Sequence, residues 1–484
     1  MQSPIQKQAD RPDIALLYRL ILLIVVLAAS YLVDLNSALV GTALPLISEQ
    51  YNINISTSQW ATFAYLLAMS GLFIVFGQIA ESVGRIKLFT AGLAVFTLGS
   101  LACGLPGSAE QFILFLIIQG IGASAMSGVG VAVLFDAFSP KWRGTALGCV
   151  VAVSGVSGAS GTILSSIIVE AFGWPATALL SAVPAALLLL CGGFICLKVP
   201  EARSNRPADW VGALLLTASF ALAVVLGLSG SSSPQISPSS PQISLLSIGS
   251  LAMFVVLLAA FVVWELTRPD APRGLRVLGD KKFLLSMASM MLLSVATGGI
   301  FTLILSCLLA YGYNPAEIGV VLILLPLSSI VPALAGGLLY DLLRWKYLTA
   351  AGLLIVAAGC LLLGLALQAS DLSLTACALI AVGAGSGLFR GPNLVNALSA
   401  LPPERSATAS SVMAAAGSIA SSFGLFLVGA LMAVQANSTG YSGSVAAGSQ
   451  SLWRSSLSIA VVIAILLCIV AAAFSVLRNT YRTG

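Results

Sequence analysis

The chain has 484 residues, 58 % of them hydrophobic and 8 % charged, and a formal net charge of +5. Soluble domains carry about 25 % charged residues, so no water-soluble fold could cover this much apolar surface. The sequence contains no histidine, which excludes a Ser-His-Asp triad, a histidine proton relay and a histidine-ligated zinc ion. We expect no metal, no cofactor and no nucleic-acid partner, and interpret the positive charge as loops that face an anionic lipid leaflet.

Apolar stretches long enough to span a membrane follow one another along almost the whole chain. They are preceded by a polar segment, residues 1–16, which we interpret as a cytoplasmic tail because no A-x-A cleavage site of a signal peptide follows it. We predict an all-α membrane protein with fourteen transmembrane helices, over 17–47, 58–81, 88–107, 111–136, 145–171, 176–198, 209–229, 244–267, 283–311, 316–340, 346–368, 372–397, 407–434 and 454–477.

The cations alternate between the connections. Every Lys and Arg except Arg390 and Arg454 lies before the first stretch, after the last one or in every second connection. The intervening connections, such as 49–57 and 104–110, carry none. Because cationic loops stay in the cytoplasm, this pattern predicts that both termini are cytoplasmic. The expected location is the plasma (inner) membrane, which the chain crosses many times.

An internal repeat relates two parts of the chain by a shift of 260 residues. The shift places glycine on glycine and acid on acid, and it aligns Gly77, Glu81, Gly92, Gly99 and Gly104 with Gly337, Asp341, Gly352, Gly359 and Gly364. Tandem repeats are typical of transporters in which one bundle rocks against the other. We therefore predict an N-terminal six-helix bundle over 17–198, an inserted helix pair with its linkers over 199–282, a C-terminal six-helix bundle over 283–477, and a second cytoplasmic tail over 478–484.

One predicted cytoplasmic turn in each repeat combines glycines, an acid and cations. The candidate gating residues are Gly77, Glu81, Gly84 and Arg85 in the first copy and Gly337, Asp341 and Arg344 in the second. Glycines let helix ends approach closely, and an acid at a helix terminus can form a charge latch. An ordinary basic loop without such a role is the alternative. The turn resembles the loop signature of the major facilitator superfamily, although that signature has an aspartate where this chain has Glu81 and a glycine where it has Arg344.

Four further segments resemble the fourteen-spanner drug:proton antiporter family of that superfamily. They are Ala43-Leu44-Pro45 with Gln59-Trp60 and Tyr65, Ser139-Pro140-Lys-Trp-Arg143-Gly144, Asp209-Trp210-Val-Gly212, and Trp264-Glu265 through Pro269. The last two belong to the inserted helix pair, so they favour this family over twelve-spanner relatives. The resemblance implies a major facilitator fold, with two six-helix bundles plus two inserted helices, and export of drugs in exchange for protons.

Two spans depart from the pattern of that family. Its span-four arginine is replaced by Leu116. In its span-five antiporter motif Ala159 replaces a proline and Thr162 replaces the final glycine, whereas the small residues Gly155, Gly158 and Gly161 are present. Small residues permit close helix contact, so this motif either serves packing alone or contributes to coupling. Both departures count against proton coupling by the route that is usual in that family.

Asp34 is the most conspicuous ionisable residue within a predicted span, about 17 residues from its start and near the middle of the membrane. A carboxylate there is costly unless it faces a cavity or is protonated. We interpret Asp34 as a proton carrier or as a counter-charge for a cationic substrate, with a structural pairing as the alternative. The aspartate that the resembling family has in this span would fall at Asn36 instead.

Arg390 lies in a glycine-rich stretch of span twelve, where it either reaches a cavity or extends to the cytoplasm. It could also pair with Asp34 across the bundle interface. Further polar candidates for the cavity are Asn36, Gln119 and Asn393. Each of these could instead form a hydrogen bond that packs two helices together.

We interpret the chain as a transporter and not an enzyme. It has no nucleotide-binding signature, so a gradient must supply the energy. The leading hypothesis is a monomeric secondary active transporter that exports amphipathic organic compounds or drugs, in exchange for protons, by rocker-switch alternating access. Its partners would be a small-molecule substrate, protons and the lipid bilayer. A proton-independent facilitator or importer of a small metabolite is one alternative, and a non-transporting membrane sensor is another.

Overall fold

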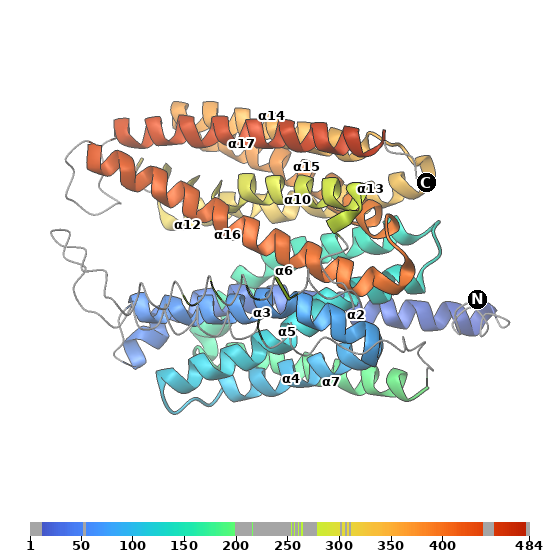
Figure 1. Cartoon of the computed structure of the whole chain (residues 1–484). Helices are drawn as coiled ribbons and strands as arrows, with labels where there is room; N and C mark the ends of the chain where they lie inside the picture. The colour runs from blue at the N-terminus through green and yellow to red at the C-terminus, as the bar shows by residue number, and fades with distance from the viewer. Residues whose placement is uncertain are drawn as a thin grey trace. The chain divides into compact units, whose positions relative to one another are not determined.

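The computed structural model describes residues 12–51, 55–198, 278–438 and 450–480, apart from 301, 302, 305, 306, 309 and 310, together with a few single positions between 215 and 264. Every regular element within these ranges is helical (Figure 1). Nine helices of the described part are long and apolar enough to cross a membrane. The seventh and eighth predicted spans, 209–229 and 244–267, lie almost wholly outside the described residues, so the predicted count of fourteen stays a prediction.

Six helices have assigned bounds among the described residues up to 198. They are α2 (Pro12–Gln50), α3 (Ile55–Val83), α4 (Arg85–Cys103), α5 (Ala109–Ala137), α6 (Arg143–Phe172) and α7 (Pro175–Lys198). The helix α2 begins inside the segment 1–16 that we had interpreted as a tail. Proline is favoured at the first position of a helix, because its missing N–H would have no partner there, and Pro12 occupies that position.

The structure assigns bounds to seven further helices and one 3₁₀ turn among the described residues of the second half. They are α10 (Lys281–Gly298), α12 (Pro315–Leu322), α13 (Leu324–Leu343), α14 (Leu348–Ala369), α15 (Leu372–Ser399), the turn Pro403–Arg405, α16 (Ser406–Ser438) and α17 (Gln450–Arg478). The predicted span 316–340 is divided between α12 and α13. Pro326 explains the division, because it lacks an N–H and its ring clashes with the carbonyl of Leu322 four residues earlier.

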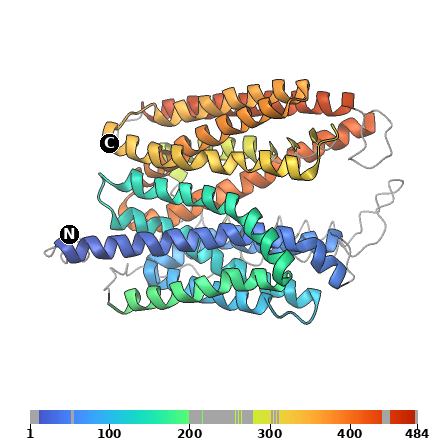
Figure 2. The same ribbon diagram turned by 180° about the vertical axis from the view of Figure 1, so that it is seen from behind.

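The helices pack in the same pattern in both halves. In the first half α4 packs on α5 and α7, α3 packs on α5, and α2 packs on α5 and α7. In the second half α14 packs on α15 and α17, α13 packs on α15, and α10 packs on α15 and α17. The packing of α7 is seen from behind in Figure 2. The 260-residue repeat therefore reflects one helical arrangement that occurs twice.

Contacts divide the chain into two compact units. Unit 1 comprises Met1–Ala137, Ser160–Val277 and Pro402–Ala415, and unit 2 comprises Phe138–Ala159, Leu278–Leu401 and Ala416–Gly484. The start of α16 thus belongs to the unit that contains α2 to α5, and the start of α6 belongs to the unit that contains α13 to α15. The starts of α16 and α6 contain the residues that contact Glu81 and Asp341, the acids of the repeat.

Candidate functional site

The acid of the first copy, Glu81, lies in the last turn of α3 and faces the start of α16. Its Oε1 atom accepts hydrogen bonds from the backbone N–H of Thr408 at 3.0 Å and from Thr408 Oγ1 at 2.6 Å. Thr408 is the third residue of α16, so its N–H has no acceptor within its own helix. The positive end of the helix dipole also favours a carboxylate at this place. Glu81 therefore caps a helix that lies far away in the sequence.

The glycine of the first copy brings α3 close to α16. Gly77 lies one turn before Glu81, and a Cβ atom at this position would lie 2.7 Å from Ser411 Cβ and 2.9 Å from the carbonyl oxygen of Ala407. On the other side of the same helix start, Ser410 Oγ donates to the carbonyl oxygen of Gly128 in α5 at 2.6 Å. Only a residue without a side chain allows this approach.

Arg85 and Asp136 add an ion pair to the first copy. Arg85 is the first residue of α4, and its Nη2 also donates to the carbonyl oxygens of Pro403 at 2.8 Å and Glu404 at 3.3 Å. Asp136 accepts from Ser406 Oγ, the first hydroxyl of α16, at 3.3 and 3.4 Å. The two charges therefore enclose the chain that leads into α16.

The acid of the second copy, Asp341, binds the start of α6 in the same way. Its Oδ1 accepts from the N–H of Gly144 at 2.9 Å, and its Oδ2 accepts from the N–H of Thr145 at 2.7 Å and from Thr145 Oγ1 at 2.8 Å. The matching glycine, Gly337, again packs on this helix start, where a Cβ atom would overlap Gly144. Both oxygens of Asp341 are occupied, whereas the contacts of Glu81 to Thr408 use one oxygen.

The acids thus contact helix termini, as the latch hypothesis requires. The sequence did not indicate their partners Thr145 and Thr408, nor the role of Asp136. The sequence does contain a pattern that could have indicated the two threonines. Thr145-Ala146 recurs as Thr408-Ala409 at a shift of 263 residues, which is close to the shift of the repeat. Whether the contacts open and close during transport remains a proposal.

Gly84 and Arg344 occupy matching positions with unusual backbone angles. Gly84 has φ 116° and ψ 136°, a region that residues with a Cβ atom avoid. Arg344 ends α13 in the left-handed conformation, with φ 46° and ψ 35°. That conformation favours glycine and is strained for arginine. The second copy therefore places a cation where the first copy has the residue that the geometry prefers.

Asp34 lies near the middle of α2 and is half-buried. It interacts electrostatically with the buried Tyr65, whose hydroxyl donates to the carbonyl oxygen of Val33 at 3.3 Å. One turn before Asp34, the hydroxyls of Tyr31 and Ser160 lie 3.0 Å apart. Ser160 lies in α6 next to Gly161, so α2 contacts this part of α6 one turn from the predicted coupling acid.

Asn36 and Gln119, both predicted for the cavity, bind each other, and their role in a transport cavity stays a prediction. Asn36 Nδ2 donates to Gln119 Oε1 at 2.9 Å, and Gln119 Nε2 donates to Asn36 Oδ1 at 3.0 Å and to Ser100 Oγ at 2.6 Å. Asn36 and Gln119 are buried, at 3 % and 1 % exposure. Their amide groups join α2, α4 and α5, which is the packing alternative that the sequence left open.

Asn393 and Arg478 form a second buried polar cluster, in unit 2. Asn393 Nδ2 donates to the carbonyl oxygen of Ser286 at 3.0 Å, and its Oδ1 accepts from Arg478 at 2.9 Å. Arg478 also donates to Ser286 Oγ at 3.2 Å and to Thr349 Oγ1 at 3.0 Å. Arg478, the first residue of the cytoplasmic tail predicted over 478–484, is the last residue of α17 and is 3 % exposed. Its long side chain is buried because hydroxyl and amide oxygens replace the water around the guanidinium group.

Arg390 lies in α15 and is half-buried. The next residue, Gly391, packs against α6, where a Cβ atom would lie 3.2 Å from the Cα atom of Gly148. Arg390 belongs to unit 2 and Asp34 to unit 1. Their predicted charge pair would join the two units, and it stays a prediction.

The span-five motif makes close helix contacts. A Cβ atom at Gly155 would lie 2.7 Å from Ser329 Oγ and 2.8 Å from the carbonyl oxygen of Pro326, and one at Gly158 would lie 3.3 Å from Pro326 Cβ. The small residues therefore let α6 and α13 pack tightly. Gly161, the last glycine of the motif, is buried. These contacts support a role of the motif in helix packing, and its contribution to proton coupling stays a prediction.

Comparison with known proteins gives the family. The model of the Major Facilitator Superfamily matches residues 26–425. The riboflavin transporter RibZ of Clostridioides difficile is 27 % identical over 403 residues, which cover 81 % of this chain and 84 % of that protein. The tetracenomycin C resistance and export protein of Streptomyces glaucescens is 27 % identical over 417 residues, which cover 85 % of this chain and 75 % of that protein.

A solved structure with the same fold is that of the proton:xylose symporter XylE. The TM-score is 0.61 with 14 % sequence identity, and the match covers 92 % of this chain and 94 % of that one. An identity this low shows the fold alone. The two copies of the acid contact are therefore placed within a fold that members of this superfamily share.

Proposed function

Because the chain belongs to the major facilitator superfamily, we propose that this multi-pass membrane transporter exports amphipathic organic compounds in exchange for protons. Transport of a small molecule and the absence of an enzymatic role follow from the family. Direction, substrate class and proton coupling are the proposal. A relative that exports an antibiotic supports the first two. We further propose fourteen spans and cytoplasmic termini, on the alternation of cations along the sequence, and a monomer in the plasma membrane.

The observation that carries the proposed mechanism is the pair of acid contacts. Glu81 holds the start of α16, and Asp341 holds the start of α6. Each contact consists of a few charge-assisted hydrogen bonds from backbone N–H groups and a threonine hydroxyl at a helix terminus to one carboxylate. Such contacts can form in one conformation and break in the other, which alternating access requires.

Proton coupling is proposed to depend on Asp34. A carboxylate within the membrane is costly and is functional by default. Asp34 lies one turn from Tyr31, whose hydroxyl contacts Ser160 in α6. A change in the protonation of Asp34 would thus act on α2 next to a helix that packs through glycines. Arg390 is the second proposed coupling residue.

The test is transport by the reconstituted full chain under an imposed pH gradient, with a panel of lipophilic dyes as substrates. Asp34→Asn keeps the shape and hydrogen-bonding capacity of the side chain but removes its charge. We expect this variant to lose gradient-driven transport at least tenfold. The matched control is Asp371→Asn, because Asp371 caps the start of α15 and asparagine is an equally good cap. Wild-type rate and pH dependence in Asp34→Asn would contradict proton coupling through this residue.

A second candidate is a transporter for a small metabolite that does not depend on protons. The similarity to a riboflavin transporter favours it, and so does the replacement of the expected span-four arginine by Leu116. The same vesicles distinguish the two functions. Uptake of riboflavin that is insensitive to the pH gradient and to Asp34→Asn, without dye export, would support the metabolite transporter. The third hypothesis, a non-transporting sensor, receives no support from the family.

A further inference from the structure

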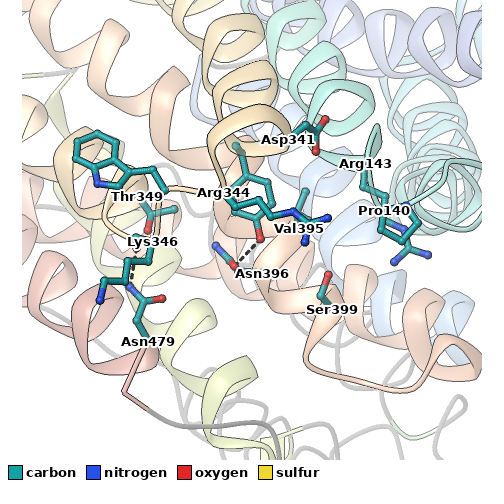
Figure 3. Close-up of a pocket in the computed structure, with 12 residues that line it drawn as sticks. Pro140, Arg143, Asp341, Arg344, Lys346, Thr349, Val395, Asn396, Ser399 and Asn479 are labelled. Carbon is teal, nitrogen blue, oxygen red and sulfur yellow. Dashed lines mark hydrogen bonds between the residues drawn. The ribbon is translucent and has the colours of Figure 1, made fainter.

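A cavity of about 300 Å³ lies beside the acid contact of the second copy, within unit 2. Its lining includes three cationic residues, Arg143, Arg344 and Lys346, and one carboxylate, that of Asp341. Figure 3 shows the side chains of Arg143, Arg344 and Ser399 around one space. Both oxygens of Asp341 accept hydrogen bonds from α6. The cavity is thus bordered by more positive than negative charge.

The repeat shows what is missing from this cavity. Close contact between Gly92 and Gly122, which joins α4 to α5, recurs between Gly352 and Gly385, which joins α14 to α15. The repeat therefore aligns α5 with α15 at a shift of 263 residues, and α4 with α14 at a shift of 260 residues. At these shifts Ser399 takes the place of Asp136, and Trp345 takes the place of Arg85.

The first copy fills the corresponding position with its own ion pair. There Arg85 contacts Asp136 and the carbonyl oxygen of Pro403, and Pro403 matches Pro140 of the cavity lining at the shift of 263. The second copy has lost both charges of that pair. It has gained cations at other positions, at Arg344 in place of Gly84 and at Arg143 in place of Ser406. A carboxylate is missing where cations have accumulated.

The backbone of Arg344 adds an independent observation. Arg344 keeps a left-handed conformation, with φ 46°, although the matching residue of the first copy is a glycine. Within the described part of the chain, its guanidinium group forms no hydrogen bond and no ion pair. Strained residues cluster at ligand sites, and Arg344 lines this cavity.

We propose that this cavity binds a phosphate-type anion, which takes the place of the carboxylate that Asp136 supplies in the first copy. Guanidinium groups match the oxygens of a phosphate well. The headgroup of an anionic lipid would supply this chemistry, because the cavity lies on the side predicted to be cytoplasmic. The lining also includes Trp345, which is 49 % exposed, and this apolar side chain would contact the acyl chains. Inorganic phosphate is the other source of the same chemistry.

The test is binding to the purified full chain, measured by native mass spectrometry with added phosphatidylglycerol or phosphatidylcholine, and by calorimetry with inorganic phosphate. Three variants change the cavity. Arg344→Gly removes a cation and relieves the backbone, Lys346→Gln removes a second cation, and Ser399→Asp restores the missing carboxylate. The matched control is Lys141→Gln, which removes an exposed cation two residues from Arg143 but outside the cavity lining.

We expect phosphatidylglycerol to bind in preference to phosphatidylcholine, with about fivefold weaker binding for each cation removed and a larger loss in Ser399→Asp. Lys141→Gln should retain the wild-type affinity. Binding of inorganic phosphate with the same dependence on the variants, and no preference between the lipids, would identify soluble phosphate as the source. The proposal is wrong if neither anion binds, or if Lys141→Gln weakens binding as much as Arg344→Gly does.

Discussion

The two acid contacts of this protein have the same central hydrogen bonds and different surroundings. In each, a carboxylate at the end of one helix accepts the N–H and the hydroxyl of a threonine at the start of another. In the first copy, the ion pair of Arg85 and Asp136 surrounds this contact. In the second copy the ion pair is replaced by Trp345 and Ser399, and a cavity lined by cations lies beside the acid.

The difference separates what the contact needs from what it tolerates. The threonine and the acid are retained in both copies because a helix start has N–H groups without partners, and a carboxylate satisfies them better than a neutral group. The neighbouring charges are less constrained, because they lie outside the helix terminus. Variation there can give one copy a ligand site without loss of the helix contact.

The largest expected effect distinguishes the two acids themselves. Asp341→Asn should expose the amides of Gly144 and Thr145, because both oxygens of Asp341 accept hydrogen bonds and asparagine has only one acceptor oxygen. Each charge-assisted bond contributes about 1.5–3 kcal/mol, so hydrogen exchange at these amides should become about 30-fold faster. Glu81→Gln should change exchange at Thr408 much less, because the Oε1 atom alone accepts both bonds. Mass spectrometry of the reconstituted protein measures both, and equal effects of the two substitutions would contradict this distinction.

A second prediction concerns the matched backbone positions. Gly84→Ala should destabilise the protein by about 1–3 kcal/mol, since φ 116° and ψ 136° are strained for a residue with a Cβ atom. Arg344→Gly should be neutral or stabilising by up to about 1 kcal/mol, because it relieves a left-handed arginine. Thermal unfolding in phosphate-free detergent, without added lipid, tests both. Destabilisation by Arg344→Gly under these conditions would mean that Arg344 has a structural role that its contacts do not show.

The smallest expected effect concerns the ion pair of the first copy. Arg85 and Asp136 are 19 % and 22 % exposed, so their coupling should amount to about 1 kcal/mol. A double-mutant cycle with Arg85→Gln and Asp136→Asn measures it by thermal unfolding. The corresponding cycle in the second copy, Trp345→Gln with Ser399→Asn, should give no coupling. Additive effects of the two first-copy substitutions would show that the pair does not stabilise the contact.

Much of the fold could be predicted from local patterns. Among the described residues, hydropathy located most helices to within a few residues, although α10 ends at Gly298, before the end of the predicted span 283–311. The glycines aligned by the 260-residue shift, such as Gly92 and Gly352, proved to be close contacts between helices. Pro326 accounts for the turn between α12 and α13, within a segment that is still one apolar span, Glu317–Leu343. Arg478 is buried because polar groups from three other helices surround it.

The sequence by itself determined the membrane class, the repeat and the two acids that matter at the helix ends. Composition and periodicity are properties of the chain that do not depend on which helices meet. Only the tertiary structure decided the partners of those acids, since Glu81 and Thr408 are 327 residues apart and Asp341 and Thr145 are 196 apart. It also decided that Asn36 and Gln119 bind each other, and that the second copy retains a cavity. These outcomes depend on which helix start lies opposite each acid, and no spacing along one segment encodes that.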